Sequence, residues 1–367
     1  MEKRSLIFEL ATLVTFLILI AIVVHFNWFE GKDYIIVNPS DFDFPISPLN
    51  DFYRALYSWQ SKDLGTYFYG FAEAPLRLGI VALYSLCGFN ISIAQQIFFV
   101  LVLYTMFLSG YLMLRTLLSY LTNIRRATNH YKISFILPST IAGNFYMFHM
   151  TTLLKYNSGY IFSLIVHAMY PLIFLCSLKY ILCKKGKYAV LLILFSLMTV
   201  SSHPAYILLI FFVPILAFPV AVVLKRENIK TCVSRTPLCA LFLITFTSTY
   251  WLPIVITLIY DKAGFVIRQL KDINGILSSA KAVDNFADLF RYLGCPPFRW
   301  TYKGDPYYPY NNVYYTPLFV FLGFFTAIVS FSGLLLRKMC AKLYKLTLLF
   351  ALYVVPVSYT HLTLPTN

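Results

Sequence analysis

The stretch LIFELATLVTFLILIAIVVHF, from Leu6 to Phe26, decides the fold of this chain. Apart from Glu9, two threonines and His25 its side chains are apolar, and the apolar residues surround the helix on all sides. An α-helix of about 20 such residues crosses the hydrocarbon core of a bilayer, which is about 30 Å thick. We therefore expect this stretch to be a membrane-spanning helix.

The composition of the whole chain points to the same class. Its 367 residues are 59% hydrophobic and 12% charged, with a mean hydropathy of +0.70. A soluble domain with so few polar residues could not cover its own surface. The apolar runs are continuous rather than alternating, which weighs against a β-barrel. The sequence therefore predicts an all-α polytopic membrane protein, and we expect it in the plasma membrane.

Other apolar runs predict about eight further spans, which makes about nine in total. The segment Leu76–Phe89 is apolar but short, so we expect it to lie at the outer membrane interface. The predicted spans, of which the last is cut short, are Ser92–Thr116, Ser134–Thr151, Ile161–Leu182, Tyr188–Ser202, Pro204–Leu224, Pro237–Ile259, Pro317–Leu336 and Leu346–Val355.

The excess of basic over acidic residues lies on one side of these spans. With the N-terminus in the cytoplasm, the inner segments hold about 18 basic and about three acidic residues, and the outer segments hold about 12 of each. Nearly all of the net charge of +15 then faces the anionic headgroups of membrane lipids. A nucleic-acid partner is not needed to explain the charge, and we expect none.

Two outer segments are long, residues 27–79 and 260–316. Function in a helical scaffold usually lies in such loops. They carry nearly all the carboxylates of the chain, whereas the spans have almost none.

We expect Glu9, near the inner end of the first span, to reach back to the cytoplasmic interface beside Lys3 and Arg4.

The C-terminal stretch PVSYTHLTLPTN, Pro356 to Asn367, breaks the pattern in the middle of a span. It resembles the translation of a sequencing adaptor. We therefore expect residues 1–356 to form one membrane domain that continues, in the native protein, beyond the truncation. Residues 357–367 are then a non-native tail.

Asp41 and Asp43 stand one residue apart in SDFDFP, just after the first span. In an extended backbone they would share a face, and two adjacent carboxylates do not both ionise at low cost. Such a pair suits a divalent cation such as Mg²⁺ or Mn²⁺, or a base with a supporting acid. The alternative is a solvated loop rich in turn-forming residues.

No P-loop, H-E-x-x-H or G-x-S-x-G motif is present, which weighs against nucleotide-driven transport and the familiar hydrolases.

The stretch SDFDFPISPLNDFYRALYSWQSKDLGTYFYG, Ser40 to Gly70, resembles the first outer loop of the GT-C class of integral-membrane glycosyltransferases. It is most similar to large archaeal and actinobacterial members of the arabinofuranosyltransferase type. The likeness rests on the two aspartates, the turn from Phe44 to Pro48, Trp59 and Gly65. It continues more loosely through YNSGYIFSLIVHAMYPLIFL, SSHPAYILL and LFRYLGCPPFRW.

The resemblance implies a fold and an activity. The fold is GT-C-like, and the activity is sugar transfer from a polyprenyl-phosphate donor to a glycan, lipid or protein acceptor outside the cytoplasm. Asp41 is then the catalytic base and Asp43 supports it, or the reverse, with either able to help hold a metal. The donor phosphate needs cations at the outer face, for which Arg54, Arg77 and Lys155 are candidates. Each of the three could equally be an interfacial anchor.

The second outer segment is rich in aromatic residues, which stack on sugar rings. Trp300, Tyr302, Tyr307 and Tyr310 are candidate acceptor contacts, although an aromatic belt at the interface explains them as well. His203, at the short turn SSHPA, is a candidate lining residue of the same cavity.

Two other functions compete with glycosyl transfer. A transporter or lipid flippase would place charges near the middle of its spans and would show internal repeats. Neither feature is evident in the sequence. A non-catalytic scaffold would leave the two long outer segments unexplained.

Overall fold

The computed structural model describes the larger part of the chain. The described residues are 2–29, 47–55, 59–60, 66–67, 74–121, 135–148, 161–200, 206–224, 229–248, 251–252, 301–302, 305–306, 316–318, 320–321, 324 and 341–348. The chain divides into two compact units, residues 1–255 and 256–367.

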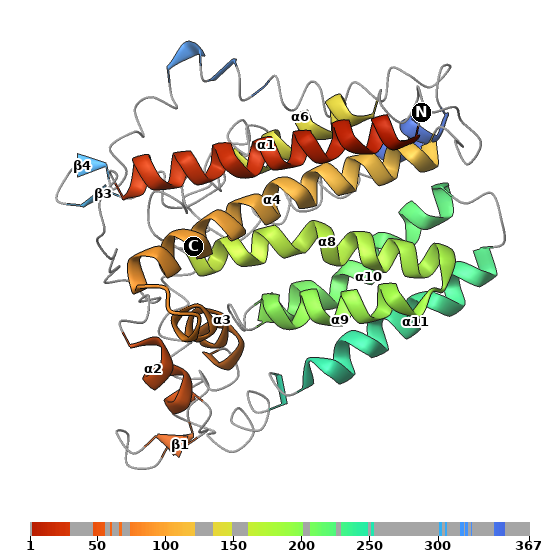
Figure 1. Cartoon of the computed structure of the whole chain (residues 1–367). Coiled ribbons are helices and arrows are strands. Elements are labelled where there is room, and N and C mark those ends of the chain that lie inside the picture. The colour runs from red at the N-terminus through yellow and green to blue at the C-terminus, as the bar shows by residue number, and fades with distance from the viewer. Residues whose placement is uncertain are drawn as a thin grey trace. The chain divides into compact units, whose positions relative to one another are not determined.

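The described residues of the first unit are almost all helical (Figure 1). Its two short strands, β1 (Trp59–Gln60) and β2 (Thr66–Tyr67), pair antiparallel. The helices in chain order are α1 (Glu2–Trp28), α2 (Pro48–Ala55), α3 (Ala74–Leu86), α4 (Ile91–Leu121), α6 (Ile136–Met147), α8 (Ile161–Cys183), α9 (Gly186–Val200), α10 (Tyr206–Leu224) and α11 (Ile229–Phe246). In the second unit the described elements are the antiparallel pair β3 (Thr301–Tyr302) and β4 (Asp305–Pro306), together with helical residues 341–348.

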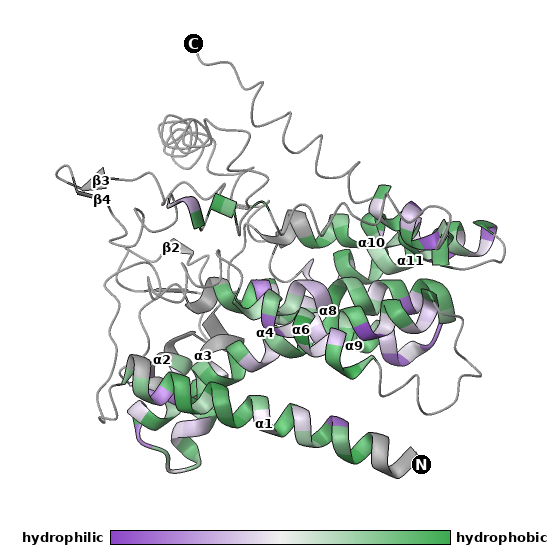
Figure 2. Cartoon of the chain, turned by 90° about the horizontal axis from the view of Figure 1, so that it is seen from above, coloured by the Kyte–Doolittle hydropathy of each residue, from purple (hydrophilic) through white to green (hydrophobic). Residues whose placement is uncertain are grey.

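Several of the described helices have the length and composition of membrane spans, as the sequence predicts. Four qualify: Leu6–Phe26, Ile91–Leu121, Leu164–Cys183 and Ile229–Phe246. Helix α9 and residues 210–224 of α10 are apolar but shorter. Figure 2 shows hydrophobic residues along most of α1. The predicted spans Pro317–Leu336 and Leu346–Val355 lie largely outside the described residues.

Helix α4 is the element around which the first unit is arranged, since it contacts α1, α3, α6 and α8. Helix α8 in turn contacts α9, α10 and α11, and most of its span is buried. Most of α1 is exposed although it is strongly apolar, so one side of α1 faces α4 and the rest is suited to lipid.

Helices α4 and α6 approach each other through glycine. A Cβ atom added to Gly143 would lie 2.7 Å from the carbonyl oxygen of Phe107, and one added to Gly110 would lie 2.9 Å from the Cβ of Tyr146. Small residues at a crossing let two membrane helices bring their backbones into contact, which strengthens van der Waals packing where no hydrophobic effect operates between helices.

The turn between α3 and α4 uses two residues with specific roles. Gly88 has a φ of 84°, a left-handed conformation that glycine adopts without a Cβ clash, and it follows the end of α3. The side chain of Asn90 accepts a hydrogen bond of 2.8 Å from the backbone N–H of Ile93 and so caps the start of α4. At about 20 Å, α3 is too short to cross a bilayer, which agrees with the expectation for Leu76–Phe89.

Helix α11 differs from its prediction. The sequence predicts a span that begins at Pro237, but the helix begins at Ile229 and Pro237 lies inside it. The residues before the proline continue the buried face, because Cys232, Cys239 and Leu243 are all buried and recur at helical spacing. Residues Ile229–Thr236 are more polar than the residues that follow, which is why the sequence analysis placed the start of the span at Pro237.

A larger side chain at Gly143 should separate α4 from α6. We expect Gly143→Leu to lower the melting temperature of the detergent-solubilised chain, at a cost of about 1–3 kcal/mol, because the added atoms meet backbone that cannot move aside alone. Gly186→Ala is the matched control, since an added Cβ there meets nothing within 4 Å. Equal melting temperatures for the two variants would contradict the close contact.

Candidate functional site

The structure describes the predicted site residues only in part. Arg54 lies in α2, Arg77 in α3 and Tyr302 in β3, where the backbone is described and the side chains are not. The remaining candidates, Asp41, Asp43, Lys155, His203, Trp300, Tyr307 and Tyr310, lie outside the described residues.

The segment that carries Asp41 and Asp43 is anchored where it leaves α1. The side chain of Phe29, directly after α1, is fully buried, and its ring lies 6.0 Å from the ring of Phe99 on α4. One turn earlier, the Nδ1 of His25 and the Oε1 of Gln96 are 3.0 Å apart. Apolar and polar contacts together therefore fix the end of α1 against α4.

The same segment is anchored again where it returns. Helix α2 packs against α3, and the ring of Phe52 lies so close to Gly79 that an added Cβ would be 3.2 Å from it. Helix α3 contacts α4, with Val81 and Ala82 buried. Residues 30–46 thus connect two points that both rest, directly or through α2 and α3, on α4.

This arrangement brings the helices of two predicted phosphate-binding residues together. Arg54 is carried by α2 and Arg77 by α3, and these two helices pack against each other. Burial raises the pKa of the Tyr84 hydroxyl on α3, so this hydroxyl remains a hydrogen-bond donor to a higher pH than that of an exposed tyrosine.

In the second unit, the β3–β4 pair places Tyr302 directly opposite Asp305. The register therefore pairs an aromatic residue with an acidic one across the two strands. The aromatic residues that flank this pair in the sequence lie outside the described residues.

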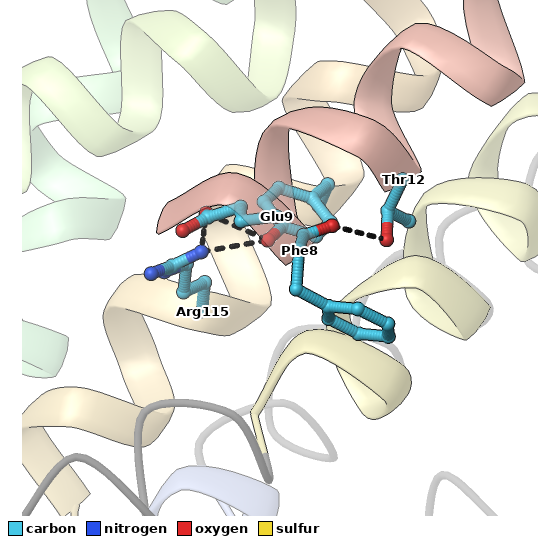
Figure 3. Close-up of polar contacts among 5 residues, drawn as sticks. Phe8, Glu9, Thr12 and Arg115 are labelled. Atoms are coloured by element: carbon cyan, nitrogen blue, oxygen red, sulfur yellow. Dashed lines mark hydrogen bonds and ion pairs between the residues drawn. The ribbon is translucent and has the colours of Figure 1, made fainter. Parts of the chain in front are cut away.

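A polar cluster that the sequence analysis missed joins α1 to α4. Glu9 forms an ion pair with Arg115 (Figure 3). The hydroxyl of Tyr111 donates a hydrogen bond of 2.8 Å to Glu9 and accepts one of 2.7 Å from the Nη1 of Arg115. The sequence analysis did not name Arg115 as a partner of Glu9, and its expectation that Glu9 lies beside Lys3 and Arg4 stays a prediction, because the side chains of those two residues lie outside the described ones. Arg115 and Glu9 are 26% and 17% exposed, so both charges are largely withdrawn into the protein.

The cluster belongs to a regular antiparallel register. From the start of α1 to its end, Glu9 accepts a hydrogen bond from Tyr111, Phe16 stacks on Phe107 with ring centroids 4.6 Å apart, and His25 contacts Gln96. The partners on α4 follow in the reverse order, so the two helices are antiparallel. The signal in the sequence was the polar residue near each end of both spans. These polar residues can be interpreted as partners only once the two spans are known to be neighbours, and the hydropathy of a single span does not show which spans are neighbours.

Among the side chains that the structure describes, no group of three His, Cys, Asp or Glu residues could hold a metal ion. The predicted metal ligands Asp41 and Asp43 lie outside that part of the chain. The metal site therefore stays a prediction from the sequence.

Comparison with known proteins adds no assignment to these residues. No protein-family model, curated protein or solved structure matches the chain. The function therefore rests on the residues of the chain and their contacts.

The Glu9–Arg115 pair should stabilise the chain. We expect Glu9→Gln and Arg115→Gln each to lower the free energy of unfolding, because each leaves a charged partner with too few hydrogen bonds in an apolar setting. In a double-mutant cycle, measured by unfolding in detergent micelles, we expect a coupling energy of about 1–2 kcal/mol. Tyr104→Phe, which removes only a hydrogen bond of 3.2 Å to the Leu13 carbonyl of the same helix pair, should cost less than either. A coupling energy near zero would contradict the ion pair.

Proposed function

We propose that the chain is a membrane glycosyltransferase that moves a sugar from a polyprenyl-phosphate donor to an acceptor outside the cytoplasm. The proposal is supported by the sequence position of Asp41 and Asp43, which lie between Phe29, packed against α4, and α2, packed against α3. A carboxylate pair held near the end of a span is suited to chemistry on a substrate that is itself anchored in the membrane.

The donor chemistry fits the kind of scaffold observed. An isoprenoid tail needs apolar surface between or beside helices, and the described helices expose large apolar side chains along α1 and α11. The phosphate needs cations near the same end of the scaffold, for which Arg54 and Arg77 are carried on packed helices. Lys155 is the third candidate cation.

The proposed reaction is a single displacement. A carboxylate, which we assign to Asp41, accepts the proton of an acceptor hydroxyl as its oxygen attacks the anomeric carbon. The bond between that carbon and the phosphate oxygen breaks, and the polyprenyl phosphate leaves with its electron pair. Asp43 supports the base, and the arginines stabilise the charge that develops on the leaving phosphate.

The acceptor is a glycan, a lipid or a protein with a free hydroxyl. Trp300, Tyr302 and Tyr307 would stack on sugar rings, and His203 would line the same cavity. A divalent cation, Mg²⁺ or Mn²⁺, would suit the oxygens of the aspartate pair and would add charge stabilisation there. The chain then belongs in the plasma membrane with its N-terminus in the cytoplasm.

A transporter or flippase is the second candidate, and the Glu9–Arg115 pair is the observation that bears on it. Ionisable groups within spans often mark a transport path. Glu9 lies in the first turn of the Leu6–Phe26 span, not near its middle. A charge pair at the end of a span anchors helices more readily than it lines a path through the bilayer, so we prefer the enzyme.

An in vitro transfer assay with labelled polyprenyl-phosphate pentoses and hexoses tests the proposal. We expect Asp41→Asn to lower turnover about 100-fold or more, since loss of a general base costs about 10²–10⁴, and Asp43→Asn to have a smaller effect. Asp51→Asn is the matched control in the same outer segment and should keep full turnover. Full turnover in both the Asp41 and the Asp43 variant would remove the assignment. Removal of divalent cations by EDTA should lower turnover, and added Mg²⁺ or Mn²⁺ should restore it.

A further inference from the structure

The turn between α8 and α9 gathers positive charge around one aromatic ring. The Nζ atom of Lys179 lies 5.6 Å from the ring centroid of Tyr188, and the Nζ atom of Lys187 lies 5.2 Å from the same centroid. Each contact is within the range of a cation–π interaction. The two ammonium groups approach the same ring and carry like charges, so they interact unfavourably with each other.

No carboxylate that the structure describes balances these lysines. Glu9 is the only acidic residue whose side chain is described, and it is paired with Arg115. The nearby guanidinium of Arg235 adds a third cation, since its Nη1 donates hydrogen bonds of 2.8 Å and 3.1 Å to the carbonyl oxygens of Ile181 and Leu182 at the end of α8.

The backbone of the turn is also unusual. Lys184 has a φ of 52°, a left-handed conformation that is unfavourable for a residue with a Cβ atom and that glycine most often adopts at helix ends. Its backbone N–H closes the end of α8 with a hydrogen bond of 2.7 Å to the Tyr180 carbonyl oxygen. A strained lysine at a helix end points toward a role for its exposed charge.

The space beside the turn is open. A Cβ added to Gly186, the first residue of α9, would meet nothing within 4 Å. Lys184, Lys185 and Lys187 are all exposed. The turn therefore offers room for an anion, with Lys179 and Lys187 close to Tyr188 and with Lys184 and Lys185 exposed in the same turn.

The position of the turn indicates what kind of anion it meets. The candidate span of α8 ends at Cys183, so Lys179 lies one turn before the end of the span and Lys184, Lys185 and Lys187 follow it, where the hydrocarbon core gives way to lipid headgroups. On α9, Lys187 shares a face with Val190, Leu191 and Leu194, which follow at helical spacing and are 57%, 37% and 50% exposed. A cationic end and an exposed apolar stripe on one helix face match an amphiphile better than a soluble anion.

We propose that the α8–α9 turn binds the phosphate headgroup of an anionic membrane lipid through Lys179, Lys184 and Lys187, with an acyl chain along the exposed face of α9 that carries Val190 and Leu194. The bound phosphate offsets the repulsion between the two ammonium groups at Tyr188. Hydrogen bonds from the lysines and van der Waals contacts along α9 hold headgroup and tail together. The site is separate from Asp41 and Asp43 and does not depend on sugar transfer.

Lipid binding to the 367-residue chain, measured by native mass spectrometry from mild detergent, tests the proposal. The probes are dioleoylphosphatidylglycerol, which is anionic, and dioleoylphosphatidylcholine, which is zwitterionic. We expect the chain to bind the anionic lipid more tightly. Lys187→Gln should weaken that binding about fivefold and leave the binding of the zwitterionic lipid unaffected, since one basic residue near a membrane surface contributes about that much.

Two matched variants distinguish a specific lipid-binding site from a general effect of the net charge of the protein. Lys345→Gln removes the same charge from an exposed lysine in the second unit and should leave binding unchanged. Lys187→Arg keeps the charge and should retain most of the affinity, which excludes misfolding as the cause of a loss. Val190→Asn with Leu194→Asn should also weaken binding, because the acyl chain loses its apolar contact.

Three results would overturn the proposal. Unchanged affinity in Lys187→Gln would mean that the lysines have a partner within the chain, such as Glu227, which lies outside the described residues. An equal loss of lipid affinity in Lys345→Gln would mean that the effect arises from net charge alone. Displacement of the lipid by an equal concentration of inorganic phosphate would identify a site for a soluble anion instead.

Discussion

The antiparallel contact between α1 and α4 is the interaction on which the rest of the structure depends. A charge pair at one end, stacked rings of Phe16 and Phe107 in the middle and the His25–Gln96 contact at the other end set one register along the whole length. Because α4 also contacts α3, α6 and α8, that register fixes the first span relative to the core of the first unit.

This contact has a direct consequence for the proposed chemistry. The residues before this segment are held against α4 through Phe29, and α2, which follows it, packs on α3, which in turn contacts α4. A base that acts on a lipid-linked substrate must stay at one depth relative to the membrane, and fixed elements before and after the segment suit that requirement. The cost of placing Glu9 within a span is offset by Arg115 and Tyr111, which satisfy its carboxylate.

Particular residues show what the sequence could and could not predict. Apolar runs such as Leu6–Phe26 predict helices well, because lipid leaves the backbone no other way to satisfy its polar groups. The start of α11 was missed because Ile229–Thr236 is polar in composition, yet it continues the buried face of Cys232 and Cys239. The Glu9–Arg115 pair was missed for a different reason, since it depends on which spans are neighbours. The glycine contact of Gly110 and Gly143 likewise becomes meaningful only once α4 and α6 are known to cross.

The distribution of charged residues predicts which ends of the helices face the cytoplasm, whereas the contacts between helices do not. The lysines at the α8–α9 turn and the carboxylates that follow α1 are expected on opposite sides of the membrane, and glycosyl transfer outside the cytoplasm requires that arrangement. Fusions of a reporter enzyme that is active only outside the cytoplasm, placed after residue 46 and after residue 185, measure the two sides most directly. The account predicts activity at residue 46 and none at residue 185, whereas the opposite pattern would contradict it.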